Sequence, residues 1–246
     1  MLILEETGKY CARLEKAVFD YVCNEKTVEK VYYTHLAQDY RSKFPTAIQK
    51  TEKHTYLYEV QYIRKDGKIH EDRTLIKKDG KEYNRQHADL ETLSFEFGKI
   101  IFGPVALLGK RRQSHYDYQI ISEDKLGQDK TVVIQATPDP TAENHCLYGK
   151  IWVRISDFAV LKIEWSEKSI QNSQEIVRRA RELGADPRFT IVFEFDVEKN
   201  GIRFPSRVRY EEAYTRGDKK KIVKSHVTVD YENYKFFTVD VDVDYN

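Results

Sequence analysis

Apolar and polar residues alternate with a period of two along most of the chain, which is the pattern of β-strands that bury one face. In one such stretch Ile191, Phe193 and Phe195 fall on the same face. The alternation predicts about eleven strands, at residues 26–34, 55–64, 68–78, 115–123, 130–137, 147–156, 159–166, 188–198, 202–214, 221–231 and 234–245. Pairs such as Asp66-Gly67 and Asn200-Gly201 favour hairpins between consecutive strands. We therefore expect one antiparallel, meandering sheet with a dry face and a wet face.

Three stretches have helical spacing instead. The first runs roughly from Leu4 to Asp20, and the third follows Asn172, a candidate N-cap, and ends at Gly184. The second covers about 88–102 and carries its apolar residues at helical spacing: Leu90, Leu93, Phe97, Ile100 and Ile101. We expect the Gly103-Pro104 pair to end this helix, and the apolar segment at 105–109 to form one short further turn.

Residues 147–167, LYGKIWVRISDFAVLKIEWSE, read as two strands joined by a turn. In the second strand Leu161, Ile163 and Trp165 share the dry face, and charged residues lie between them. In the first strand Trp152 falls on the charged face. The two tryptophans are therefore predicted to lie on opposite faces of the sheet.

The helices are too few to cover a flat sheet of this size. Eleven strands would make a sheet about 50 Å wide, whereas three helices cover about 30 Å. Curling the sheet into an incomplete barrel lets part of the dry face cover itself. The predicted fold is therefore mainly β (α+β): a single curved antiparallel half-barrel, residues 1–246 in one domain, with roughly three helices on its concave face. Loops, a partner or an apolar ligand would cover the remaining dry face.

Charge and composition exclude several classes. The formal net charge is +1, from 41 basic and 40 acidic residues, so the basic excess of a nucleic-acid binder is missing. The mean hydropathy is −0.67, and no apolar stretch has the length of a membrane span. Cys11, Cys23 and Cys146 have no CxxC spacing, which argues against a zinc site. A bridge between Cys11 and Cys23 would require the first helix to end between them, and buried thiols are the alternative.

No familiar catalytic motif occurs in the chain. G-x-S-x-G, the P-loop, H-E-x-x-H and G-x-G-x-x-G are all absent from the sequence. Asp240, Asp242 and Asp244 share one strand face but lack the glycine and terminal glutamate of a calcium loop. We therefore expect a protein that is not an enzyme and holds no cofactor or metal.

The 147–167 hairpin and the order of elements resemble the bacterial outer-membrane lipoprotein carrier (LolA-like) superfamily. The hairpin residues that carry the resemblance are Gly149, Ile151, Trp152, Val153, Leu161 and Glu164. The later segments 205–210 and 231–237 are similar to the closing strands of that superfamily. The resemblance implies an apolar half-barrel closed by helices, and a periplasmic protein of the cell envelope whose signal peptide lies outside this sequence. A cytoplasmic protein is the alternative.

These observations predict a protein that holds an acyl chain, a lipid or a lipoprotein on the concave face. The predicted ligand-binding residues are Leu161, Ile163, Trp165, Ile191, Phe193, Phe195, Val239 and Val241, and the predicted lid residues are Leu93, Phe97, Ile100 and Leu107. Affinity would come from apolar burial, at about 0.8 kcal/mol per CH₂. The alternative is an interaction or envelope-stress sensor module with a fully packed core, which would bind other envelope proteins and no lipid.

Overall fold

The computed structural model describes residues 2–16, 20–37, 46–65, 68–85, 90–92, 100–139, 147–169, 174–217 and 220–237. The helices are α1 (Leu2–Lys16), η1 (Ile100–Phe102), α2 (Gly103–Leu108), η2 (Gln113–His115), η3 (Glu167–Ser169) and α3 (Gln174–Leu183), the η elements being 3-10 turns. The strands are β1 (Asp20–Ala37), β2 (Thr46–Lys65), β3 (Lys68–Lys78), β4 (Lys81–Arg85), β5 (Tyr116–Leu126), β6 (Asp129–Pro138), β7 (Gly149–Arg154), β8 (Val160–Trp165), β9 (Asp186–Glu194), β10 (Val197–Lys199), β11 (Ile202–Phe204), β12 (Arg207–Arg216) and β13 (Lys220–Phe237).

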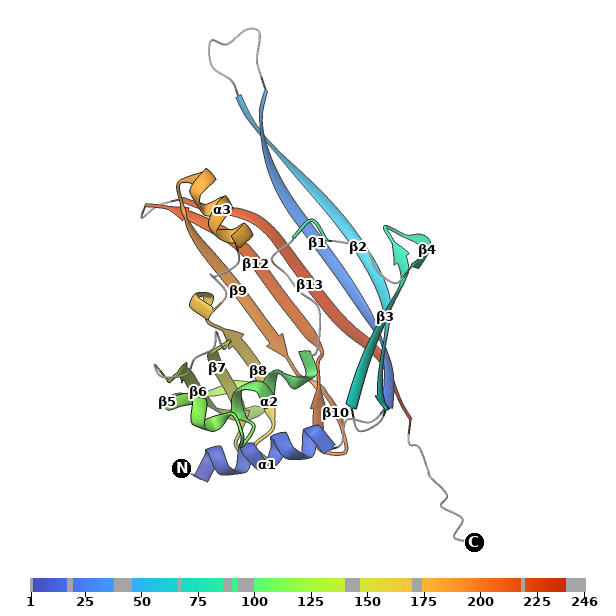
Figure 1. Ribbon diagram of the computed structural model, residues 1–246, viewed down its shortest axis with the longest axis vertical. Coiled ribbons are helices and arrows are strands. Elements are labelled where there is room, and N and C mark those ends of the chain that lie inside the picture. Colours follow the sequence, from blue (N-terminus) through green and yellow to red (C-terminus); the bar gives the residue numbers. More distant parts are fainter. Residues whose placement is uncertain are drawn as a thin grey trace.

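Eleven strands form one open antiparallel sheet, in the order β4-β3-β2-β1-β13-β12-β9-β8-β7-β6-β5. Two meanders built from neighbouring strands meet where β1 pairs with β13, the fourth and fifth strands of the sheet. Figure 1 shows the long strands β1, β2 and β13 on one side of β12 and β9, and the shorter strands β5 to β8 on the other. The prediction of a mainly β, antiparallel fold is confirmed, and the pairing of β1 with β13 joins segments from opposite ends of the chain.

Several predicted strands have different bounds. The two strands expected at 221–231 and 234–245 form a single strand, β13, up to Phe237, and residues 238–246 lie outside the described part. The strands expected at 188–198 and 202–214 are each divided, and β10 and β11 form a separate two-stranded sheet. Asn200 and Gly201 both have positive φ and close this hairpin, as predicted.

The first helix is shorter at its C-terminal end than expected. It ends at Lys16, and β1 already begins at Asp20, whose carboxylate accepts a hydrogen bond from the backbone N–H of Arg64 at 2.6 Å. Cys11 and Cys23 lie on different elements and are free, buried thiols, whereas Cys146 lies outside the described residues. The alternative of buried thiols is therefore the correct one for this pair.

The α-helix expected at 88–102 is not found in the described part of that range. Residues 90–92 are not helical, and 100–102 form a 3-10 turn, while 86–89 and 93–99 lie outside the described residues. The backbone N–H groups of Glu91 and Thr92 donate to Glu29 instead of to helical carbonyls. Gly103 and Pro104 begin α2 rather than breaking a helix, because proline needs no N–H partner in a first turn.

The helices α2 and α1 form successive layers over one face of the sheet. A β-carbon on Gly103 would lie 3.2 Å from Cδ1 of Ile163 and 3.6 Å from Cζ2 of Trp165, so glycine lets α2 approach β8 closely. Helix α1 packs on α2, and the Cys11 thiol lies 3.4 Å from the Pro104 carbonyl oxygen. Figure 1 shows α1 and α2 together at one end of the sheet, and α3 near β9 and β12 at the other.

Candidate functional site: the inner face of the sheet

The sheet presents one continuous row of side chains beneath the helices. The register of the strands aligns Ile134, Ile151, Ile163, Phe193, Val208, Val229, Thr27 and Tyr56, in that order, from β6 to β2. Directly paired residues point to the same side of a sheet. We call the face that carries this row the inner face.

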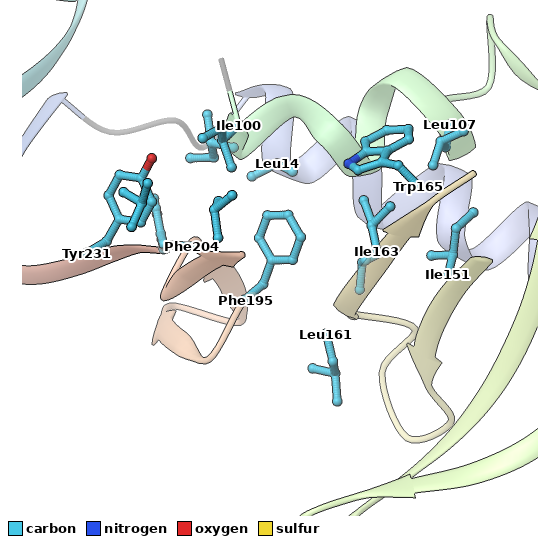
Figure 2. Close-up of a cluster of buried hydrophobic side chains, with 14 of the residues drawn as sticks. Leu14, Ile100, Leu107, Ile151, Leu161, Ile163, Trp165, Phe195, Phe204 and Tyr231 are labelled. Carbon is cyan, nitrogen blue, oxygen red and sulfur yellow. The ribbon is translucent and has the colours of Figure 1, made fainter. Parts of the chain in front are cut away.

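The part of the inner face from β6 to β13 is apolar and mostly buried. Ile134, Ile151 and Ile163 are 0% exposed, as are Val208 and Val229. Figure 2 shows Ile163 and Trp165 projecting toward α2, with Leu107 of α2 near the indole ring. Helix α2 therefore lies directly on β8 and β9 within the apolar part of the inner face.

The structure gathers the described members of the predicted ligand and lid sets in one core. Leu161, Ile163, Trp165, Phe195, Ile100 and Leu107 are buried in it, and the partly buried Ile191 and Phe193 pack against it. Trp165 and Phe193 meet edge to face, with their ring centroids 5.6 Å apart. Val239, Val241, Leu93 and Phe97 lie outside the described residues.

Trp152 lies on the opposite face, as its position in the alternation predicts. Its indole Nε1 donates to the Asp124 carboxylate at 2.8 Å, and the Lys162 ammonium lies 3.9 Å from the ring centroid. The hydrogen bond from Trp152 lowers the pKa of Asp124 below its ordinary value. This tryptophan is therefore held by polar contacts far from α2, which makes it a useful internal reference.

The inner face changes character at β1. Thr27 is the neighbour of the apolar Val229 in the row, and Glu25 and Glu29 flank it on the same face of β1. Thr27, Glu25 and Glu29 are all 0% exposed. We call Glu25, Thr27 and Glu29, together with Ser225 and Tyr231 of β13, the polar stripe.

The pattern of the sequence did not single out the polar stripe as a site. Charged residues on a strand ordinarily indicate its solvent face. The sequence did contain one indication, which is the alternation along β1. Tyr21, Cys23 and Val31 lie on the same face of the strand as Glu25, and all three are buried. Partners on other elements explain why the carboxylates can be buried there.

Glu25 is buried in an ion pair with Arg73 of β3. The guanidinium lies 2.8 Å from one Glu25 carboxylate oxygen, and it also lies 2.9 Å from the carboxylate of Glu71. Burial raises the pKa of Glu25, and the charge of Arg73 opposes this rise. Two carboxylates thus share one guanidinium, which leaves a local net charge of −1.

Glu29 fixes residues 90–92, which we call the strap, across the inner face. Its carboxylate accepts the backbone N–H groups of Thr92 at 2.7 Å and Glu91 at 3.3 Å, and the hydroxyl of Tyr56 at 3.2 Å. Leu90 and Thr92 are buried by this arrangement, at 8% and 2% exposed. A single carboxylate therefore connects β1, β2 and the strap.

Several oxygens of the polar stripe have no hydrogen-bond partner within the described protein: Glu25 Oε1, Thr27 Oγ1, Ser225 Oγ and Tyr231 Oη. The Tyr231 hydroxyl is near enough to lower the pKa of Glu25, but it lies outside hydrogen-bond geometry. Buried polar atoms are ordinarily paired, so four such oxygens on two adjacent strands mark an unusual surface. Each is able to accept a hydrogen bond, and the three hydroxyls are also able to donate one.

Two other kinds of feature concern the described residues, namely metal sites and helices that could span a membrane. No group of three or more His, Cys, Asp or Glu side chains within the described ranges could hold a metal ion. None of the helices in the part of the chain that the structure describes is long and apolar enough to cross a membrane.

Comparison with known proteins gives structural likenesses only. No family model matches the chain, and no curated protein matches it. A DUF1329 family protein from Desulfovibrio piger is 12% identical with a TM-score of 0.45, covering 98% of this chain and 94% of that one. A LolA superfamily protein from Nitrosomonas europaea is 11% identical with a TM-score of 0.37, covering 96% and 94%.

A third structure is that of a putative outer membrane lipoprotein-sorting protein domain from Vibrio parahaemolyticus. It is 9% identical with a TM-score of 0.40, and covers 97% of this chain and 94% of that one. The neighbours include the superfamily that the 147–167 hairpin resembles. At these scores they carry no argument about ligand or activity, which must come from the site itself.

Proposed function

We propose that this protein is a non-enzymatic, periplasmic binding protein that holds an acyl chain, of a lipid or a lipoprotein, between α2 and the apolar part of the inner face. The observation that carries the proposal is the continuous apolar row from Ile134 to Val229, which is covered at Ile163 and Phe193 by a helix of only six residues. A helix this short has little stability of its own and depends on packing. Moving α2 outward would expose Ile163, Phe193 and Trp165 together.

Capture would exchange protein contacts for ligand contacts. Gly103 of α2 packs closely against β8 and leaves no free space there. An acyl chain would therefore have to take the place of α2 against the sheet. The binding free energy would come from apolar burial, at about 0.8 kcal/mol per CH₂. Affinity should then rise about fourfold for each added CH₂ until the chain outgrows the face.

The two tryptophans of the chain offer a direct test. The variant Trp152→Phe leaves Trp165 as the only tryptophan, and monoacylglycerols with brominated chains should quench its fluorescence on contact. The matched control Trp165→Phe leaves only Trp152, on the other face, and should not be quenched. Equal quenching of the two variants, or binding that does not depend on chain length, would contradict the proposal.

A second candidate is an interaction or sensor module with a permanently packed core. The observation that favours it is the complete burial of Ile163 and Phe195, at 0% exposed. Such a protein would show no quenching with any chain length. The same titration therefore separates the two functions.

A further inference from the structure

The polar stripe lies beside the apolar part of the inner face, on the same side of the sheet. Val229 and Thr27 are direct partners in the row, so the change from apolar to polar occurs over one strand spacing, about 4.8 Å. An apolar chain lying across β8 to β13 would therefore bring its polar end to β1. This step rests on the proposed function.

The stripe offers a defined hydrogen-bonding chemistry. Glu25 Oε1 is an acceptor only, and the hydroxyls of Thr27 and Ser225 are also without a protein partner. The guanidinium of Arg73 is engaged by Glu25 and Glu71. The Lys78 ammonium lies over the Tyr56 ring, 5.3 Å from its centroid.

The local charge disfavours an anion at this position. A ligand carboxylate or phosphate near Glu25 would be a third negative group around one guanidinium. It would also face a buried carboxylate oxygen that cannot donate a hydrogen bond. A hydroxyl, an amide N–H or an ammonium group would instead donate to that oxygen.

We infer that the polar stripe selects the polar end of the ligand: a hydrogen-bond donor that is uncharged or cationic, and neither a carboxylate nor a phosphate. The strap lies over this region through Glu29, so the ligand's polar end displaces residues 90–92 as it binds. Glu25 and Thr27 are the residues that recognise it.

Four ligands with the same sixteen-carbon chain test the inference on the purified full chain: palmitate, monopalmitoylglycerol, palmitamide and hexadecylammonium. We expect the last three to bind at least about tenfold more tightly than palmitate. In the Glu25→Gln variant the net charge of residue 25, Arg73 and Glu71 together changes from −1 to 0, and the disadvantage of palmitate should become smaller.

A milder pair of variants keeps the test open if Glu25→Gln does not fold. Thr27→Val removes one unpartnered hydroxyl from the stripe and should weaken monopalmitoylglycerol binding about 3- to 10-fold. Thr131→Val is the matched control, because Thr131 is also 0% exposed with an unpartnered hydroxyl but lies on the outer face of β6. It should leave binding unchanged.

The outcomes separate this inference from the function on which it rests. If none of the four ligands binds, the proposed function and the inference both fail. If palmitate binds as tightly as monopalmitoylglycerol, or if Thr27→Val behaves like Thr131→Val, acyl binding stands and the head-group inference is overturned.

Discussion

The strap should be released by removing one carboxylate, in the variant Glu29→Ala. Glu29 accepts two backbone N–H groups of the strap and the Tyr56 hydroxyl. A buried donor without a partner costs about 1–3 kcal/mol, so keeping the strap in place would cost about 2–6 kcal/mol for its two N–H groups. Exposing the Leu90 side chain costs about 1.5–3 kcal/mol. Because the second cost is smaller, we expect the strap to leave the sheet.

The assay is hydrogen exchange at the amides of Glu91 and Thr92. In the variant these amides should lose their protection, while amides in the central β1–β13 pair remain protected. The free energy of unfolding should fall by about 1.5–3 kcal/mol, the cost of exposing Leu90. A matched control is Glu59→Ala, which removes a carboxylate from the outer face of β2 and should change stability by less than about 0.5 kcal/mol.

Unchanged protection of the Glu91 and Thr92 amides in Glu29→Ala, with unchanged stability, would contradict this prediction. That outcome would mean that contacts other than the Glu29 carboxylate hold the strap. If the strap also competes with a ligand's polar end, Glu29→Ala should bind monopalmitoylglycerol more tightly than the unaltered protein does.

Three further predictions concern the sheet and its charges. Gly149→Ala should lower the free energy of unfolding by more than about 2 kcal/mol in urea titrations, because the added Cβ would lie 2.1 Å from a backbone oxygen of β8; a loss no larger than that of Lys150→Ala would contradict this. Ile163→Ala should lower the free energy of unfolding by about 2–5 kcal/mol. Ile120, at the edge of the same row, is 45% exposed, so Ile120→Ala should lower it by less than about 0.5 kcal/mol. Equal losses would show that the row is not buried as described. Burial raises the pKa of Asp157, but the hydrogen bonds from Arg154 and from the Ala159 backbone N–H, together with the charges of Arg154 and Arg203, outweigh burial, and the pKa is lowered. A carboxylate whose pKa is lowered by folding stabilises the protein at any pH above its ordinary pKa, and this stabilisation is lost as the pH falls through its pKa in the folded state. Asp157→Asn should therefore lower the free energy of unfolding by its full amount at pH 7 and by less below about pH 4. A loss that does not change with pH would contradict this prediction.

Much of the fold could be predicted because local rules govern it. Alternation alone identified most strands, and Asn200-Gly201 closes its hairpin with the positive φ values that the pair favours. The same alternation placed Ile163 and Trp165 on the inner face and Trp152 on the outer one. These assignments hold because successive side chains of a strand point to opposite faces, whatever the strand pairs with.

The predicted helix at 88–102 shows where local rules stop. Leu90 has apolar helical spacing with its neighbours, yet residues 90–92 are not helical, and the backbone N–H groups of Glu91 and Thr92 donate to Glu29. Hydrogen bonds from a distant strand replaced the helical ones at this point. Spacing reports which residues would share a face of a helix, and it contains no information about a competing acceptor elsewhere in the fold.

The sequence alone was enough to predict most of the strands, the Asn200-Gly201 turn and the two faces of the sheet. The pairing of β1 with β13, from opposite ends of the chain, became known only from the folded structure. It alone decided that Glu25 and Glu29 are buried, because their partners, Arg73 and the strap, come from other segments. The physical reason is that a period of two assigns a side chain to a face, whereas burying a charge depends on counterions and donors that only folding brings within reach.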